Sequence, residues 1–93
     1  MAGLRIVWED RPWPGAELRL VVNGWTFYAM VSASMVDGFT WRVDWSNAAG
    51  AKGSESGDVS DRTGDFGTAK AEAEAVIRRI AAIPLIPRSS SYR

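Results

Sequence analysis

The chain of 93 residues contains no cysteine and no histidine. Their absence excludes disulfides, thiolate nucleophiles and imidazole bases, together with the zinc, haem and iron–sulfur sites that depend on these ligands. An excess of charge is also absent, because 11 basic residues balance 11 acidic residues. The chain therefore has no overall field that would attract nucleic acid or an anionic membrane, and a charge-driven partner must recognise a local patch.

Long hydrophobic runs are missing as well. The first apolar run is interrupted by Glu9 and Asp10, and no later stretch approaches the roughly 20 apolar residues of a membrane span. We therefore expect a protein with no membrane segment and no signal peptide, and we favour a cytoplasmic location. The length allows one compact core, so we predict a single domain over residues 1–87 and a flexible tail over residues 88–93.

Large aromatic side chains, in contrast, are abundant, with five Trp, three Phe and two Tyr. Each buries roughly 150–250 Å², so a few of them can build the core of a small domain. Between residues 16 and 46 apolar residues alternate with a period of two, which indicates an antiparallel meander of strands.

The first turn of this meander is Asn23-Gly24, the favoured sequence of a two-residue type I′ hairpin, in which both positions take positive φ. The turn pairs Val22 with Trp25, and counting outward assigns one face of the sheet to the core. The residues predicted on this face are Leu18, Leu20, Val22, Trp25, Phe27, Ala29, Val31, Ala33 and Met35.

The second turn contains Asp37-Gly38, and a two-residue loop there would send the Trp side chains of the next strand to the wrong face. We therefore predict a three-residue loop over residues 36–38, with Gly38 in the left-handed conformation of a G1 bulge. The cross-strand pairs of this register are Met35 with Phe39, Ala33 with Trp41, and Ala29 with Trp45. Small residues then face large ones, which keeps the sheet face even under a helix.

The segments on either side of the meander carry weaker signals. Leu4, Ile6 and Trp8 alternate with their neighbours and predict a short first strand, ended by the prolines that follow Arg11. Residues 46–57 are rich in Ala, Gly, Ser and Asn and have no apolar period, which predicts a mobile loop. Residues 56–62 can form a weak edge strand.

An amphipathic helix is predicted near the C-terminus, because apolar residues recur there at spacings of three, four and seven. The residues of this stripe are Ala69, Ala73, Val76, Ile77, Ile80 and Ala81. Thr68 is the expected N-cap and Pro84 ends the helix, which gives a length of about 14 residues. The predicted fold class is therefore α+β: an antiparallel meander of three to four strands, with one C-terminal helix packed on its Trp face.

The sheet face away from this helix supplies the first candidate site, whose residues are Arg19, Tyr28, Met30 and Arg42. In the predicted register, Tyr28 lies beside Arg19, Met30 lies between Glu17 and Asp44, and Ser32 lies opposite Arg42. A solvated face with compensated charges is the simpler interpretation. The alternative is a binding surface, because Tyr, Met and Arg are enriched at the centres of protein interfaces, where Lys is depleted.

An acidic stretch over residues 55–65 supplies the second candidate site, with a local charge of −3. Its acids are Glu55, Asp58, Asp61 and Asp65. Asp58 and Asp61 are the candidates for docking on a basic partner, and a solvated loop is the simpler interpretation. The stretch lacks the alternating acids, central Gly and closing Glu of an EF-hand, so we expect no metal site.

Catalysis finds little support in the sequence. Glu9 with Asp10, or Asp58 with Asp61, could form carboxylate pairs, but neither pair has the pocket and positioned partner that acid–base chemistry needs. The glycines are scattered at turns and form no phosphate-binding loop. We therefore expect a protein that is not an enzyme and has no cofactor.

The run from Gly64 to Ala73 follows antiparallel strands and resembles the end of AP2-type and integrase arm-type DNA-binding domains. In that family a three-stranded sheet leads through a Gly-x-Phe-x-Thr turn into a helix with spaced alanines. The matching residues are Gly64, Phe66, Thr68, Ala69 and Ala73. The resemblance implies that the open sheet face grips DNA, for which this chain offers Arg19 and Arg42, beside Glu17 and Asp44.

A second resemblance, at the level of class only, is to the small proteins of phages and mobile elements, including anti-CRISPR inhibitors. It rests on the size of the chain and on the elimination of catalysis. We therefore expect a non-catalytic protein-binding module, an inhibitor that occupies a surface of another protein, which can belong to a nucleic-acid-binding complex. The alternative is a DNA-binding domain of the AP2 or integrase-arm kind.

Overall fold

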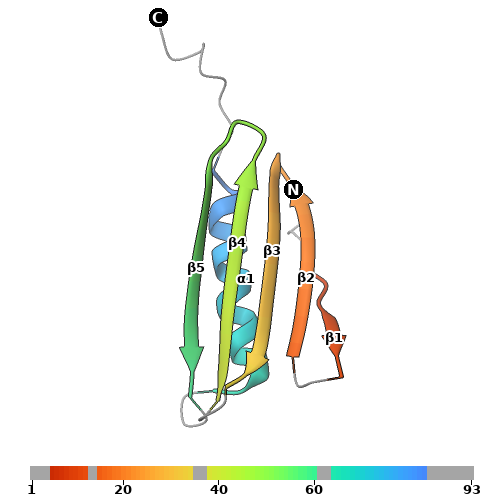
Figure 1. Cartoon of the computed structure of the whole chain (residues 1–93), viewed down its shortest axis with the longest axis vertical. Helices are drawn as coiled ribbons and strands as arrows, with labels where there is room; N and C mark the ends of the chain where they lie inside the picture. Colours follow the sequence, from red (N-terminus) through yellow and green to blue (C-terminus); the bar gives the residue numbers. More distant parts are fainter. Residues whose placement is uncertain (1–4, 13–14, 35–37, 61–63, 84–93) are drawn as a thin grey trace, which may run out of the picture.

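The computed structural model describes residues 5–12, 15–34, 38–60 and 64–83. One open antiparallel sheet of five strands, in chain order, carries a single helix on one of its faces (Figure 1). The elements are β1 (Glu9–Arg11), β2 (Gly15–Val22), β3 (Trp25–Ala33), β4 (Phe39–Asn47), β5 (Lys52–Val59) and α1 (Phe66–Ala81). The predicted α+β class is confirmed, with five strands where three to four were expected. The predicted tail over residues 88–93 lies outside the described residues.

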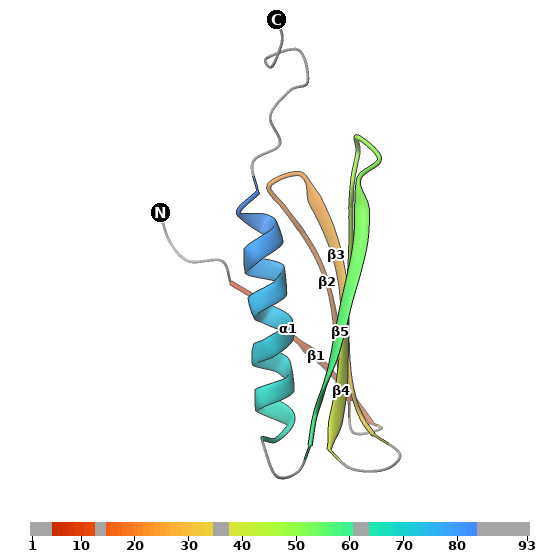
Figure 2. The same cartoon turned by 90° about the vertical axis from the view of Figure 1, so that its left-hand side faces the viewer.

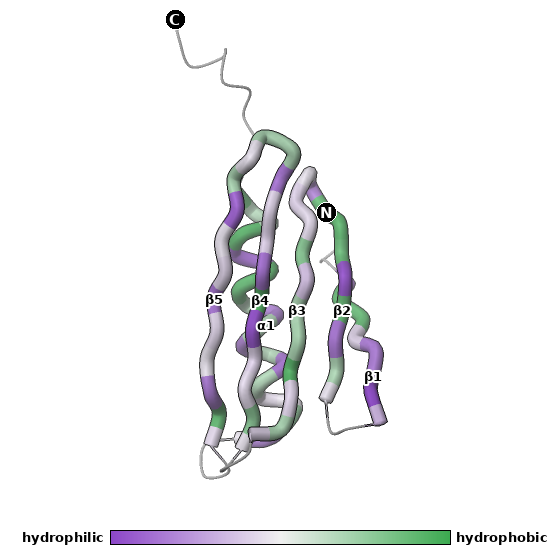
Figure 3. Tube along the Cα trace, in the orientation of Figure 1, coloured by the Kyte–Doolittle hydropathy of each residue, from purple (hydrophilic) through white to green (hydrophobic). Residues whose placement is uncertain are grey.

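The hairpin between β2 and β3 has the predicted turn and register. Asn23 and Gly24 both have positive φ, of 53° and 83°, and Val22 pairs with Trp25. Hydrophobic and hydrophilic residues alternate along the first part of β2, and its end is continuously hydrophobic, as Figure 3 shows. Leu18 and Phe27, on the predicted core face, are buried, and Figure 2 shows the helix lying over this face.

The register between β3 and β4 differs from the prediction by two residues. Ala33, not Met35, pairs with Phe39, and the Ser34 N–H donates to the Gly38 carbonyl at 2.8 Å. Gly38 does have positive φ, but a Cβ there would overlap the Val59 carbonyl on β5, so contact with β5 also demands glycine. Because the shift is even, every side chain keeps its predicted face. The rest of this turn, residues 35–37, lies outside the described residues.

The shifted register also changes how bulk is distributed under the helix. Val31 lies opposite Trp41 and Phe27 opposite Trp45, so the predicted pairing of Trp with Ala is wrong. Aromatic and β-branched pairs of this kind stabilise antiparallel strands. The compensating small residues come instead from β5, on the other side of β4.

Strand β5 replaces the mobile loop predicted for residues 46–57. Gly57 pairs with Trp41 and Gly53 with Trp45. A Cβ on Gly57 would lie 2.8 Å from the Trp41 indole, and a Cβ on Gly53 would lie 2.7 Å from the Trp45 indole. These glycines therefore leave room for the two indoles, and β4 supplies the backbone partners of a strand with little propensity of its own. The edge strand predicted over residues 56–62 is confirmed for residues 56–59, Ser60 lies beyond the end of β5, and residues 61–62 lie outside the described residues.

Strand β1 is shorter and lies later in the chain than predicted. Its ladder ends where Glu9 pairs with Glu17, and the preceding segment crosses to the helix side of the sheet (Figure 2). Ile6 and Trp8 pack there against the core, and the Trp8 indole N–H donates to Glu74 Oε2 at 2.7 Å. The alternation thus identified side chains that contact the core, but these residues lie before β1 and not in a strand.

Helix α1 begins three residues earlier than predicted, because its N-cap is Asp65 and not Thr68. The Asp65 carboxylate accepts the Thr68 backbone N–H at 3.0 Å, and the Thr68 hydroxyl accepts the Asp65 N–H at 3.2 Å. This is a capping box with Asp first and Thr third, not the usual Ser or Thr followed by Glu. A Cβ on Gly64 would lie 2.5 Å from Thr68 Oγ1, so the close approach of the capping Thr68 side chain requires glycine at this position.

The predicted apolar stripe of α1 is confirmed, because all six of its residues are buried. Three indole N–H groups beneath or beside the helix donate to it or to the residues just after it. Trp41 reaches Glu72 Oε1 at 2.9 Å, and Trp25 reaches the Ile83 carbonyl at 3.4 Å, in addition to the Trp8 bond. No helix among the described residues has the length and apolar character that crossing a bilayer requires.

Candidate functional site

The surface of interest is the open face, defined here as the side of the sheet opposite α1. Strand register places on it the odd-numbered residues of β1 and β2 and the even-numbered residues of β3, β4 and β5. No described residue forms a second layer over this side, which faces the viewer in Figure 1. Its best exposed apolar side chains are Val21, at 72%, and Met30, at 42%.

The centre of the open face joins three of the predicted site residues more closely than the sequence indicated. Met30 pairs directly with Arg42, and Tyr28 pairs with Asp44, so the predicted contact of Met30 with Asp44 is wrong. Ser32 pairs with Thr40 instead of Arg42, and their hydroxyl groups lie 3.4 Å apart. Tyr28, Met30 and Arg42 therefore form one contiguous group on the two central strands.

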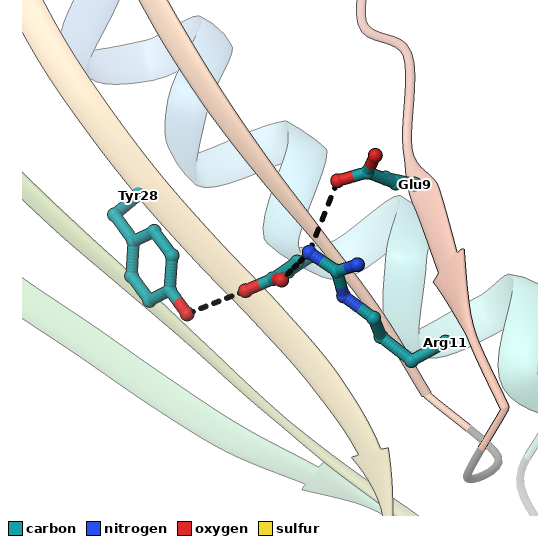
Figure 4. A network of polar contacts seen from close by, with 4 residues as sticks. Glu9, Arg11 and Tyr28 are labelled. Atoms are coloured by element: carbon teal, nitrogen blue, oxygen red, sulfur yellow. Dashed lines mark hydrogen bonds and ion pairs between the residues drawn. The ribbon is translucent and has the colours of Figure 1, made fainter.

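Tyr28 is held in place by its neighbours on β2. Its hydroxyl donates to Glu17 Oε1 at 2.7 Å, and the Arg19 guanidinium lies over its ring, 5.5 Å from the centroid. Glu17 in turn forms an ion pair with Arg11, which also reaches Glu9 Oε1 at 3.0 Å (Figure 4). This network fixes the orientation of the Tyr28 ring.

Shallow depressions flank the Tyr28 ring on both sides. One lies toward β2 and is lined by Arg19, Leu20, Val21, Thr26, Phe27 and Tyr28. The other lies toward β5 and is lined mainly by Tyr28, Asp44, Ser46, Lys52 and Ser54. A third depression surrounds Met30 and Arg42 and extends to Ser56 and Asp58. A partner's side chains can therefore be received on either side of Tyr28 and beside Met30.

The β5 contribution to the open face was largely missed by sequence reasoning, which treated Lys52 and Ser54 as loop and placed Ser56 where this loop meets a weak edge strand. A signal was available: Trp41 and Trp45 are four residues apart, and so are Gly53 and Gly57. An antiparallel neighbour of β4 needs small residues at this same spacing if it is to leave room for both indoles, and Gly53 and Gly57 supply them.

Charges on the open face are balanced. Its basic residues are Arg11, Arg19, Arg42 and Lys52, and its acidic residues are Glu9, Glu17, Asp44 and Asp58. Arg42 Nε lies 3.0 Å from Asp44 Oδ1, although the Arg42 side chain remains 65% exposed. The face therefore presents alternating signs and no basic stripe.

The acidic stretch predicted as a single docking loop is divided by the fold. Glu55 lies on the helix side of β5 and forms an ion pair with Arg79. Asp65 caps α1, and the hydrogen bond from the Thr68 backbone N–H lowers the pKa of its carboxyl group. Asp58 alone lies on the open face, opposite Thr40, and Asp61 lies outside the described residues. Glu55, Asp58 and Asp65 therefore do not share one surface, and docking through Asp58 and Asp61 stays a prediction.

Carboxylates do not converge into a metal-binding group of three or more anywhere in the described ranges. Comparisons with models of protein families, with curated proteins and with solved structures find no match to this chain.

Proposed function

We propose that the open face is a protein-binding surface and that the chain is a small non-catalytic binding module. The observation that carries the proposal is the exposure of Met30 at the centre of the sheet, beside Arg42 and Tyr28. Met, Arg and Tyr are enriched at the centres of protein interfaces, and Arg and Tyr are among the residue types that supply most of the affinity there.

Rigidity of the surface supports the same proposal. Met30 and Arg42 project from β3 and β4, two of the three strands that have neighbours on both sides, and Tyr28 is fixed by Glu17 and Arg19. A partner that binds such a surface loses little of its affinity to the ordering of loops or side chains. Depressions beside Tyr28 and Met30 give a partner's side chains places to insert.

Charge balance bears on the choice between a protein and DNA as the partner. Duplex DNA requires several Lys or Arg side chains aimed at phosphates, which acidic neighbours would repel. Arg11 and Arg42 are each engaged by a carboxylate on the same face. Alternating charges suit a protein surface with the complementary pattern, where they fix orientation and exclude wrong partners.

Within this proposal, occupying the partner's surface is itself the activity, as in the small inhibitors of phages and mobile elements. The partner is a protein, alone or within a nucleic-acid-binding complex. A DNA-binding domain of the AP2 or integrase-arm kind is the alternative that the experiment must separate.

The test compares partner capture by the unaltered chain with capture by Arg42→Glu and Tyr28→Ala, after brief crosslinking and quantitative mass spectrometry. Arg5→Glu is the matched control, because Arg5 is exposed outside the sheet and its reversal changes the net charge equally. We expect each open-face variant to recover about fivefold less of the partner, equivalent to about 1 kcal/mol, and the control to recover the full amount. Equal recovery on all four baits would overturn the proposal.

A duplex DNA titration distinguishes the alternative. The protein-binding proposal predicts no binding to arbitrary duplex DNA at low salt, measured by fluorescence anisotropy. Affinity that falls steeply as salt is added, and that is lost in Arg42→Glu, would favour the DNA-binding domain.

A further inference from the structure

Within the part of the chain that the structure describes, the outer edge of β5 presents an unpaired row of backbone groups. Strand β5 is the last strand of the sheet and pairs only with β4 among the described strands (Figure 1). The Asn47 N–H donates to the Ala51 carbonyl at 2.9 Å, which fixes the phase of the β4–β5 ladder. In an antiparallel ladder the peptide groups of alternate residues point toward one neighbour. The N–H and C=O groups of Lys52, Ser54, Ser56 and Asp58 therefore point outward.

This edge carries few of the devices that usually prevent strand pairing. Proteins protect long edge strands with proline, bulges or central charged side chains. The segment over residues 52–59 has no proline, and its register with β4 runs without a bulge from Lys52 to Val59. On the open face its charges lie near its two ends, at Lys52 and Asp58. Its central charge, Glu55, lies on the helix side and is neutralised by an ion pair with Arg79. The edge is thus open to another strand.

The sequence of β5 reads almost identically in both directions. Around Glu55 the order is Lys52-Gly53-Ser54-Glu55-Ser56-Gly57-Asp58, in which only the terminal Lys and Asp exchange. Two antiparallel copies centred on Glu55 set Ser54 opposite Ser56 and Gly53 opposite Gly57. Lys52 of each copy then lies opposite Asp58 of the other, so opposite charges meet twice.

We propose that two copies of this chain associate through β5, antiparallel and centred on Glu55, to form a continuous ten-stranded sheet. The four outward-facing residues of each copy occupy the hydrogen-bonded positions of the new ladder, which gives about eight backbone hydrogen bonds. Isologous pairing of one segment with itself closes the assembly as a two-fold dimer.

The dyad brings two Glu55 side chains together on the helix side of the sheet. Each is already paired with Arg79 of its own α1, so the seam contains two carboxylates and two guanidinium groups. The helices have room, because α1 lies over β3, β4 and β5, and two helices centred over β4 would be three strand spacings apart. That separation is about 14 Å, wider than the 8–10 Å of helices in contact.

A charge-swap series tests the proposal by sedimentation velocity over a wide range of protein concentration. Asp58→Lys and Lys52→Asp each replace two attractive pairs with two repulsive ones, so each should raise the dimer Kd at least about tenfold. The double variant, Lys52→Asp with Asp58→Lys, restores opposite charges at both positions. We expect its dimer Kd to return to within about threefold of the original.

A cysteine crosslink tests the centre of the pairing, and the chain has no cysteine to interfere. Residue 55 faces its own copy in a non-hydrogen-bonded pair, where Cα atoms lie about 4.5 Å apart and a disulfide can form. Glu55→Cys should therefore oxidise to a covalent dimer. Ser54→Cys is the matched control, because residue 54 faces residue 56 and not itself.

The outcomes are decisive in both directions. The proposed dimer is supported if the single charge variants dimerise more weakly, the double variant regains its affinity, and a disulfide forms at residue 55 but not at residue 54. A chain that remains monomeric at all concentrations overturns it, as does a dimer that neither charge variant weakens. The proposed protein-binding function is independent, since its readout is partner capture by open-face variants and not self-association.

Discussion

The two faces of the sheet are built from the same strands and differ in almost every other respect. On the helix side Phe27, Ala29, Val31 and Val43 are fully buried, and Trp indoles donate hydrogen bonds to α1. On the open face Met30 and Arg42 are exposed, and charged groups pair with one another across short distances. Alternation with period two thus separates the side chains that stabilise the fold from those of the proposed binding surface: one face holds the fold together, and the other can vary in chemistry at little cost to stability.

The largest expected effect comes from breaking the helix-side face. Trp41 is 7% exposed, lies against Gly57 and donates to Glu72. Trp41→Ala should lower the free energy of unfolding by about 3–5 kcal/mol, because it leaves a cavity and unpairs a carboxylate. Urea unfolding followed by far-ultraviolet circular dichroism measures this change. Unaltered stability would show that β4 does not face the helix as described.

A smaller effect is expected from filling the space that β5 provides. Gly57→Ala places a methyl group against the Trp41 indole, and the cost of such overpacking is about 1–3 kcal/mol. Gly53→Ala is the matched variant, because it meets the Trp45 indole, which is only partly buried and can move more easily. Thermal unfolding should therefore rank Gly57→Ala as the more destabilising of the two. If Gly53→Ala were the more destabilising variant, the tighter contact would be the one between Gly53 and the Trp45 indole.

The helix-side face also depends on the cap that starts α1, with a weaker and pH-dependent contribution. Hydrogen bonds from Thr68 lower the pKa of Asp65 from its ordinary value of 3.8. Because the folded-state pKa is the lower one, this stabilisation is present above about 3.8 and is lost as pH falls through the folded-state pKa. Asp65→Asn keeps a capping side chain without the charge.

Unfolding midpoints measured from pH 7 down to pH 2 for the unaltered chain and Asp65→Asn test this contribution. The difference between the two unfolding midpoints should narrow as the Asp65 carboxyl group becomes protonated. A difference that stays constant over this range would mean that the Asp65 carboxylate contributes no pH-dependent stability.

The smallest expected change in stability comes from altering the open face. Arg42→Glu removes an exposed ion pair and touches no core residue, so the free energy of unfolding should change by less than about 0.5 kcal/mol. The same variant is expected to lose partner capture. Urea unfolding beside the capture experiment sharpens the contrast between the faces: a large loss of stability in Arg42→Glu would show that they are not independent.

Local patterns determined much of this protein. The type I′ turn at Asn23-Gly24 and the face of every described residue of β2, β3 and β4 followed from turn chemistry and the period of two. The six-residue stripe of α1 followed from helical spacing. These features are readable because each repeats over a few residues of one segment, where backbone geometry alone sets which side chains share a face.

The tertiary structure decided what depends on a neighbour distant in sequence. Strand β5 has little strand propensity, and its place comes from β4 and from the Trp41 and Trp45 indoles that its glycines accommodate. The predicted β3–β4 register differs from the observed one by two residues, and both registers place every side chain on the same face. The hydrophobic pattern therefore cannot distinguish the two registers, whereas the contact of Gly38 with β5 does. Which residues meet Met30 on the open face was therefore fixed only by the assembled sheet, because register is a property of two strands and not of one.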